Sequence, residues 1–557
     1  MASFLKHVRQ VSGLTLVSRL AGFARDAVLA HFLGAGQVMS AYATAFALPN
    51  AMRNLFGEGA LSAAFIPVFT QYAESGDRKA ASRFMSLVIV LLVTTLSALT
   101  LVVVGVLMLL RYLSEEAPQY HLLFGLAAVM FPFAIFVCLV ALLQAALNAC
   151  RHFVVPALAP IVLNLFIIAA AVAGGLWVTE DAVRRAYLIA GAILAAGAVE
   201  VAIQVPALRR AGLTFRPAWD LAHPALRRVL TLIVPMALAI GVIEINANMD
   251  KLVGYVLMRP EGGAETFRLG ALQVAYPMKT GAPAILYYAQ RLYWLPLGVF
   301  GIALSTVMFP EFSRYALRQD LAGLARGASH AMRLALFVGV PAGAGIVLIC
   351  EPFIQLFLHH GRFADPMAAS DAVQRTVWAA TIYATGIWAF SANHVLVRAF
   401  YARQDVRTPL RIAALSAGVN LVLDLVLVWP LAERGLALAT VVAAMVQLVA
   451  LVGLVNRRFA HLGWGEITRS AARTLLATAA MGAAVWAVLR WAVPLLGWTG
   501  RPLYAVQCFG GVAVGAAAFL LVARLLGMTE LKDLLTRAAP DPDDPGAPGL
   551  DPGAPPS

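Results

Sequence analysis

Apolar stretches of about 20 residues recur along this 557-residue chain. Each is long enough to cross the ~30 Å hydrocarbon core of a membrane as a helix. The composition agrees, because 61% of the residues are hydrophobic and 13% are charged, whereas soluble domains carry about 25% charged residues. The sequence predicts an all-α polytopic membrane protein with fourteen transmembrane helices, at 11–33, 40–70, 84–110, 121–149, 156–178, 186–207, 229–258, 284–310, 331–357, 376–397, 409–430, 435–455, 472–495 and 503–526.

The net charge of +13 would suggest a nucleic-acid partner for a soluble protein. Here Lys and Arg gather in alternate loops. If the N-terminus is cytoplasmic, the cytoplasmic loops hold more than twice as many of them as the outer loops. The positive-inside rule therefore predicts a multi-pass protein with both termini in the cytoplasm. The charge reflects topology, and we expect no nucleic-acid partner.

A weak internal repeat suggests two halves. ALSAAFIPVFTQY (Ala60–Tyr72) and ALSTVMFPEFSRY (Ala303–Tyr315) share Ala, Leu, Ser, Pro, Phe and Tyr at equal spacing, each after an upstream Leu-Pro. Both end spans of the same orientation, as in transporters with parallel repeats. We predict two pseudo-symmetric six-helix lobes at 1–210 and 211–458, two added helices at 459–530 and a disordered cytoplasmic tail at 531–557, which is rich in Pro, Gly and Asp.

Charged residues inside the first span give the strongest functional signal. The stretch VSRLAGFARDAVLAHFLGAG carries Arg19, Arg25 and Asp26, and an ionised group at a helix centre costs about 2.5–3.5 kcal/mol on insertion scales. Such groups usually face a bundle interior or a wet cavity. Asp26 lies too far along the helix from Arg19 for direct contact. We therefore expect its partner to lie on another helix.

Two further arginines lie in other spans. Arg53 follows Leu48-Pro49-Asn50 in the second span, with Glu58 as a local counter-charge, and Arg291 enters the eighth span just before Pro296. Because arginines outnumber acids, the residues favour a positively charged cavity that binds phosphate or pyrophosphate. The alternative is that these arginines snorkel to an interface or lock helices together through ion pairs.

A second polar group lies in later spans. Asp250 precedes Lys251 in the seventh, Asn420 and Asp424 are four residues apart in the eleventh, and Thr440 lies in the twelfth. Oxygen ligands without His or Cys suit a hard cation such as Na⁺. The alternative is an Asp250–Lys251 pair or a network of hydrogen bonds that locks the helices.

Enzyme motifs are absent from the sequence, which has no HExxH, no GxSxG, no P-loop and no Asp-rich metal–phosphate motif. The four cysteines lie in or at the ends of apolar spans without metal-ligand spacing, so we interpret them as packing residues. We expect a transporter and not an enzyme, with no required cofactor.

Several long motifs in register resemble the MurJ (MviN) lipid II flippases of the MOP exporter superfamily. The similarity runs from the first span to about the twelfth. The motifs are SRLAGFARDAVLAHFLGAG, ALPNAMRNLFGEGALSAAFIPVF, LNACRHFVVPALAPIVLN, YYAQRLYWLPLGVFGIALSTVMFPEFSR and FYARQDVRTPLRIA. The resemblance implies a MATE-like fold of two lobes around a central cavity, with alternating access between the two membrane faces. It implies that the last two helices form a groove for a lipid tail.

The resemblance also implies residue roles. The cavity charges Arg19, Arg25, Asp26, Arg53 and Arg291 would serve the pyrophosphate of the substrate. A sodium site would comprise Asp250, Asn420, Asp424 and Thr440, with Leu436 offering a carbonyl. The chain departs from the family at Ser40, Gln290 and Trp294, where many members carry acids, and in its longer loop at 259–283.

The leading hypothesis is a lipid II flippase of the bacterial cytoplasmic membrane that supports cell-wall synthesis. Its expected partners are lipid II and membrane lipids, together with proteins of the division or elongation machinery, and the chain is expected to be a monomer. The alternatives are a lipid-linked oligosaccharide flippase or a cation-coupled drug antiporter of the same superfamily. A cation exporter should have a net acidic cavity, which four arginines argue against.

Overall fold

The computed structural model describes residues 2–55, 61–75, 77–150, 152–220, 223–365 and 371–535. The predicted tail at 531–557 falls largely outside these residues, and so does Glu58. Before the single hairpin of the described chain, the helices are α1 (Ala2–Leu33), α2 (Gln37–Met52), α3 (Leu61–Glu74), α4 (Arg78–Leu113), α5 (Pro118–Met130), α6 (Phe133–Ala149), α7 (Val154–Ala173), α8 (Ala182–Arg210) and α9 (Pro224–Val256).

The second part of the chain begins with the hairpin, which lies inside the long loop at 259–283 and was not predicted. Its strands β1 (Thr266–Leu269) and β2 (Leu272–Ala275) pair antiparallel. The helices that follow are α10 (Ala282–Pro296), α11 (Ile302–Leu317), α12 (Leu321–Phe357), α14 (Ala372–Thr385), α15 (Ile387–Ala402), α16 (Arg407–Leu431), α17 (Glu433–Arg458), α18 (Trp464–Ala487), α19 (Arg501–Ala505), α20 (Gly511–Leu525) and α21 (Thr529–Leu535).

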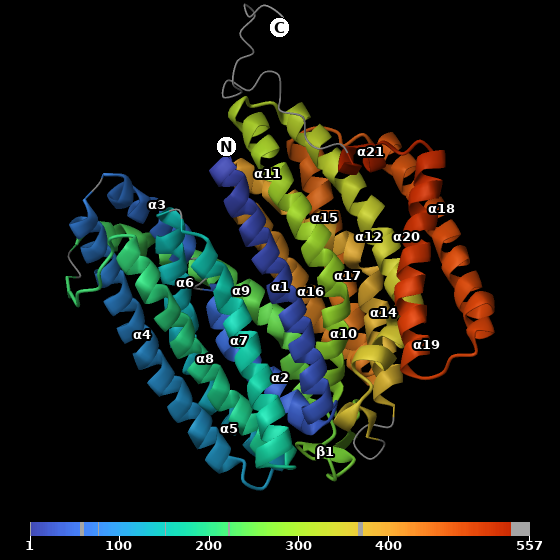
Figure 1. The fold of residues 1–557 in the computed structure, drawn as a ribbon, viewed down its shortest axis with the longest axis horizontal. Coiled ribbons are helices and arrows are strands. Elements are labelled where there is room, and N and C mark those ends of the chain that lie inside the picture. The colour runs from blue at the N-terminus through green and yellow to red at the C-terminus, as the bar shows by residue number, and fades with distance from the viewer. Residues whose placement is uncertain are drawn as a thin grey trace, which may run out of the picture.

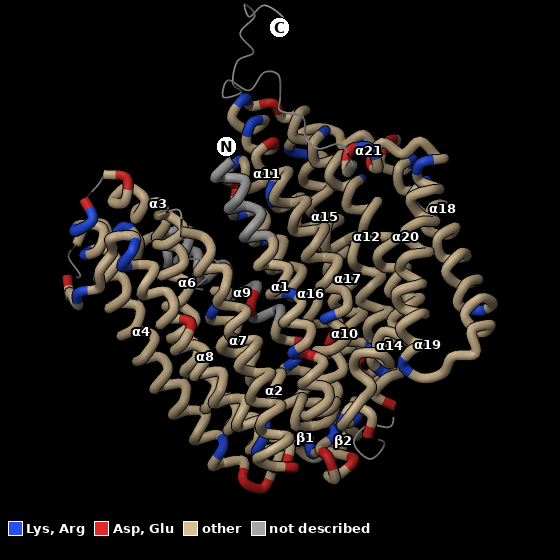
Figure 2. The backbone as a smooth tube through the Cα atoms, viewed as in Figure 1, with Lys and Arg blue, Asp and Glu red and all other residues tan. Residues whose placement is uncertain are grey.

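The prediction of an all-α polytopic membrane protein is confirmed. In the described residues, ten helices or runs of helices are long and apolar enough to cross a membrane, so the count of fourteen spans stays a prediction. Large apolar side chains point outward along these helices, as with Leu101 at 75% and Val422 at 60% exposure. Such exposure fits a lipid environment. Figure 2 shows that charged residues gather mainly at the ends of the helices.

The helices form two groups that meet at one end. Figure 1 shows α3 to α8 on one side and α11 to α20 on the other, with α1 between them. Near the hairpin a single apolar core joins both groups, and it includes Tyr42, Ile193, Tyr288 and Tyr383. Away from the hairpin each group has its own core, one around Phe84 and the other around Leu324, Leu396 and Leu451. The molecule is therefore closed across its middle at the hairpin end.

Polar bonds fix the hairpin loop to the second helix group at this end. Arg375 Nε lies 2.6 Å from Glu433 Oε1, both side chains are at most 7% exposed, and Arg375 Nη1 donates to the carbonyl of Thr280. Lys279 Nζ lies 2.6 Å from Asp371 Oδ2. Burial opposes ionisation of Asp371, but the hydrogen bond from Lys279 and the charge of Arg375 outweigh it and lower the pKa of Asp371. These bonds tie the end of the hairpin loop to α14 and α17.

The start of α10 approaches the turn between α1 and α2 through main-chain atoms. Gly281 has a φ of +88°, and a Cβ at this position would collide with the carbonyl oxygen of Ala35. Only glycine avoids both the strain of this backbone region and the collision. Nearby, Ala284 N donates to Ser40 Oγ at 3.3 Å, and Tyr288 donates to the carbonyl of Gly34 at 3.0 Å.

We expect Gly281→Ala to lower the free energy of unfolding by about 3 kcal/mol, because strain and overpacking add at this position. Thermal unfolding of the purified chain in detergent measures the loss. Gly262→Ala is the matched control, since Gly262 also has a positive φ (+68°) but open space around it. That variant should lose only about 1 kcal/mol. Equal losses would show that the contact with Ala35 is unimportant.

Candidate functional site

The charged residues of α1 and α10 meet at the carboxylate of Asp26. Its Oδ1 accepts hydrogen bonds from Arg25 Nε at 3.0 Å and Arg25 Nη2 at 2.8 Å, and from the hydroxyl of Tyr287 at 2.7 Å. Arg291 Nε lies 3.2 Å from Asp26 Oδ2. The Asp26 side chain is 5% exposed. A carboxylate so buried depends on these donors, because losing one partner of a buried pair is strongly destabilising.

The partner of Asp26 on another helix, predicted from the sequence, is Arg291. The two hydrogen bonds from the neighbouring Arg25 to the single oxygen Oδ1 were not foreseen. Arg25 also reaches the other side of α1, where its Nη1 donates to Asn164 Oδ1 on α7 at 3.0 Å. Asn164 Nδ2 in turn donates to the carbonyl of Ser18 at 3.4 Å. The cluster therefore links α1 to α7 and to α10.

Arg291 is the more accessible of the two arginines. Its side chain is 38% exposed, compared with 12% for Arg25, and its guanidinium lies over the ring of Tyr287 at 4.4 Å. Tyr287 and Arg291 are four residues apart on α10, so they share one helix face. This spacing was the signal in the sequence that could have identified Tyr287.

The other predicted cavity arginines make bonds elsewhere. Arg19 Nη2 donates to the carbonyl of Gly298 at 3.2 Å. Arg53 Nη2 donates to Asn54 Oδ1 at 3.2 Å, and Asn54 Nδ2 donates to Glu244 Oε2 on α9, also at 3.2 Å. Arg25, Asp26 and Arg291 thus form one bonded cluster, whereas Arg19, two turns earlier on α1, and Arg53, at the end of α2, do not bond to Asp26.

The three departures from the family pattern have separate roles. Ser40 Oγ donates to the carbonyl of Gly36 at 2.9 Å and accepts from α10, as described above. Gln290 Nε2 donates to the hydroxyl of Tyr383 at 3.2 Å, and Trp294 is 53% exposed. All three side chains are neutral, so none of them adds a negative charge beside Arg291.

The second predicted group comes together between α9, α16 and α17. Asn420 Nδ2 donates to Asp250 Oδ1 at 2.9 Å and to Asp424 Oδ2 at 3.0 Å. Thr440 Oγ1 lies 2.7 Å from Asp250 Oδ2 and 3.1 Å from the carbonyl oxygen of Leu436. Asp250, Asn420 and Asp424 are at most 4% exposed. All five predicted residues therefore form one buried network, which we call the carboxylate pair site.

The chemistry of this site fits a hard monovalent cation. Asn420 Oδ1 and Asp424 Oδ1 are buried oxygens without a hydrogen-bond donor. Two buried carboxylates, beside two acceptor oxygens that receive no hydrogen bond, need a cation or a proton to offset their charge. The described residues contain no group of three or more His, Cys, Asp or Glu side chains that could hold a metal ion, so a cation here would also need the amide, hydroxyl and carbonyl oxygens. Lys251 donates to Asn248 on its own helix at 3.2 Å and makes no direct bond to Asp250. The other form of the alternative, a network of hydrogen bonds that locks the helices, agrees with the bonds described above.

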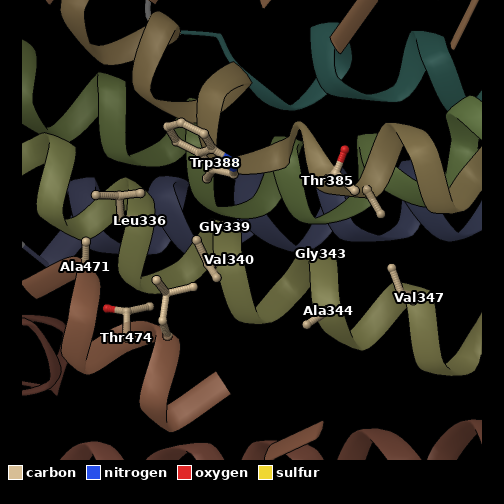
Figure 3. Close-up of a pocket in the computed structure, with 12 residues that line it drawn as sticks. Leu336, Gly339, Val340, Gly343, Ala344, Val347, Thr385, Trp388, Ala471 and Thr474 are labelled. Atoms are coloured by element: carbon tan, nitrogen blue, oxygen red, sulfur yellow. The ribbon is translucent and has the colours of Figure 1, made fainter. Parts of the chain in front are cut away.

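An apolar groove of about 420 Å³ lies where α12, the end of α14, the start of α15 and α18 meet (Figure 3). Its walls are mainly small and apolar side chains, and α15 contributes Trp388. Thr474 Oγ1, on α18, is buried there without a hydrogen-bond partner. The groove is therefore an apolar surface with one polar group that is not satisfied.

The fold is that of the membrane transporters of the MOP superfamily. An inward-facing multidrug resistance MATE family transporter of that superfamily matches with a TM-score of 0.58 at 14% identity, over 82% of this chain and 95% of that chain. A lipid II flippase MurJ in an inward closed conformation matches with a TM-score of 0.69 at 20% identity, over 94% of this chain and 99% of that chain.

The chain belongs to the MurJ family of lipid II flippases. The family model described as "Lipid II flippase MurJ" matches residues 29–495. The probable lipid II flippase MurJ of Rhizobium tropici is 32% identical, over 94% of this chain and 95% of the relative. That of Rhizobium meliloti is 33% identical, over 95% of both chains. The resemblance predicted from the sequence motifs is thereby confirmed.

We expect Asn164→Ala to lower the free energy of unfolding by about 1.5–3 kcal/mol, because it removes the acceptor for a charged donor of Arg25. The measurement is thermal unfolding of the purified chain in detergent. Asn148→Ala, at an exposed position on α6, is the control and should change stability by less than about 0.5 kcal/mol. A loss no larger than in the control would mean that Asn164 does not hold Arg25.

Proposed function

We propose that this chain moves lipid II, the undecaprenyl-pyrophosphate-linked peptidoglycan precursor, from the inner to the outer leaflet of the bacterial cytoplasmic membrane. The observation that carries the proposal is the bonded cluster of Arg25, Asp26 and Arg291 between the two helix groups. Family membership supports the same substrate and does not favour the drug antiporter or oligosaccharide flippase. Transport here is binding and movement without bond cleavage, so no enzymatic step is proposed.

The cluster is suited to a pyrophosphate because it holds two arginines against one carboxylate. An arginine fork matches two phosphate oxygens in a bidentate manner. Arg291 is partly exposed and presents its guanidinium on the face of Tyr287. Arg19, earlier on α1, and Arg53, at the end of α2, would add positive charge along the path of the headgroup. The sugar and peptide parts of the substrate would occupy the space between the helix groups.

We propose alternating access between lobes 1–210 and 211–458. The shared core at the hairpin end and separate cores at the other end support a state that is closed at the hairpin. With both termini in the cytoplasm, the hairpin lies on the outer face and this state opens inward. Movement of the cluster charges across the membrane would respond to the membrane potential, at about 2.3 kcal/mol per charge for 100 mV.

We propose that the undecaprenyl tail stays in the lipid along the last two spans, at 459–530. The apolar groove between α12, α15 and α18 supports this role, because it offers a binding surface of matching chemistry next to α18. The headgroup can then enter the cluster while the tail remains outside. We further propose that the chain acts as a monomer beside proteins of the division or elongation machinery, without nucleic acid.

The carboxylate pair site would hold Na⁺ through Asp250, Asn420, Asp424, Thr440 and the carbonyl of Leu436. The two acceptor oxygens without donors support this assignment. A bound Na⁺ would offset one of the two carboxylate charges and so favour one packing of α9 against α16 and α17. The site would thereby couple an ion gradient to the return of the substrate-free chain, with no cofactor required.

We expect Arg25→Ala and Arg53→Ala each to abolish rescue of a flippase-depleted bacterium, because each removes a positive charge proposed to serve the pyrophosphate. A lipid II accessibility assay in the same cells measures flipping directly. Arg268→Ala, in the exposed hairpin strand, is the control and should rescue fully. Full rescue by both test variants at normal membrane levels would refute the role of the arginines in binding pyrophosphate.

We expect Asp424→Ala to remove the dependence of transport on sodium and to slow flipping, because only one carboxylate remains for the cation. The measurement is lipid II translocation in proteoliposomes with sodium or choline outside. Asp220→Ala, in a loop, is the control and should keep the wild-type response. Normal transport by Asp424→Ala with the sodium response of the wild type would show that the site is structural.

A further inference from the structure

Tyr287 contacts all three charged residues of the cluster. Its hydroxyl donates to Asp26 Oδ1 at 2.7 Å and accepts from Arg25 Nη2 at 3.3 Å. Its ring lies beneath the guanidinium of Arg291 at 4.4 Å. The side chain comes from α10, whereas Arg25 and Asp26 come from α1, and the residue is 6% exposed. A single tyrosine therefore bridges the two helices that carry the cluster.

The two arginines differ in how far their donors are used. Arg25 donates through Nε and Nη2 to Asp26, and through Nη1 to Asn164. Arg291 contacts Asp26 through Nε, and its partly exposed guanidinium is held over the Tyr287 ring. In this state Arg291 is the arginine that can receive a ligand. Arg25 can do so only when its two hydrogen bonds to Asp26 Oδ1 are broken.

Asp26 therefore competes with the ligand. A carboxylate and a phosphate bind an arginine fork in the same geometry, so a phosphate-bearing ligand must replace Asp26 at one or both arginines. A hydrogen bond donated to Asp26 offsets part of its charge and weakens its hold on them. The Tyr287 hydroxyl supplies that bond to the same oxygen that Arg25 uses.

We propose that Tyr287 is a positioning residue that sets how readily Asp26 releases the two arginines to a phosphate-bearing ligand. The proposal rests on the function proposed above, which makes lipid II that ligand. The hydroxyl weakens the attraction of Asp26 for the two arginines, and the ring keeps the Arg291 guanidinium in place. Without the hydroxyl, Asp26 holds both arginines more tightly, and the ligand binds less well.

The test compares Tyr287→Phe with the wild type in binding of lipid II, with inorganic pyrophosphate as a competing probe. The purified full-length chain in nanodiscs is used. Phenylalanine keeps the ring beneath Arg291 and removes only the hydroxyl. We expect about a tenfold rise in the Kd for lipid II, the size of one hydrogen bond to a charged group. The maximal flipping rate at saturating lipid II should change less than twofold.

Two further variants separate positioning from structure. In an Asp26→Asn background the competing carboxylate is absent, so adding Tyr287→Phe should raise the Kd less than twofold. Tyr288→Phe removes a neighbouring buried hydroxyl that bonds the carbonyl of Gly34 at 3.0 Å. That control should leave the Kd unchanged. Thermal unfolding of each variant verifies that the chain is folded.

The outcomes distinguish this proposal from the proposed function. If the wild type binds lipid II and Tyr287→Phe binds it equally well, the role of Tyr287 is overturned and the function stands. An equal loss with and without the Asp26 carboxylate overturns it as well, because the tyrosine then acts only on structure. If the wild type binds no more lipid II than a lipid lacking pyrophosphate, the proposed function itself fails.

Discussion

The carboxylate of Asp26 is the constraint on which the centre of this molecule depends. It is buried, and its donors come from its own helix and from α10. Removing one of these donors without a replacement would leave the Asp26 carboxylate buried and only partly compensated in a medium of low dielectric constant, which is destabilising. The contact between α1 and α10 is therefore made of the same groups that would receive an anionic ligand. A substitution in this cluster therefore affects both ligand binding and the packing of α1 against α10.

The distribution of the apolar cores shows at which end of the molecule the two helix groups are held together. One core joins both helix groups at the hairpin end, while the groups have separate cores at the other end. Dispersion thus holds the hairpin end closed, and polar bonds between the groups add specificity, such as that from the Tyr255 hydroxyl on α9 to the carbonyl of Gln119 on α5 at 2.7 Å. The charged cluster joins α1 to both α7 and α10, so it can respond to movement of either group.

Sequence patterns predicted the helices and the proximity of Asn420 to Asp424, because both follow from simple helix geometry. Apolar runs define membrane spans, and the i,i+4 spacing of Asn420 and Asp424 places both on one face. The bond between Arg25 and Asp26 depends on side-chain rotamers, which helical angles do not give. In the sequence, Tyr287 cannot be told from the other aromatic residues of an apolar span, because its role depends on its contacts with Arg291 and Asp26. The hairpin in 259–283 was hidden because its strands are only four residues each.

The contact between Gly281 and the carbonyl of Ala35 has an evolutionary consequence. Side-chain contacts can drift, because a larger residue on one side can be matched by a smaller one on the other. Here main chain meets main chain, so no partner can shrink to make room. The closure at the hairpin end can be lost by mutation at this point, but its strength cannot be changed there in small steps. Mutations that adjust how tightly the two helix groups hold together at this end must therefore lie around this contact, for example in the hairpin.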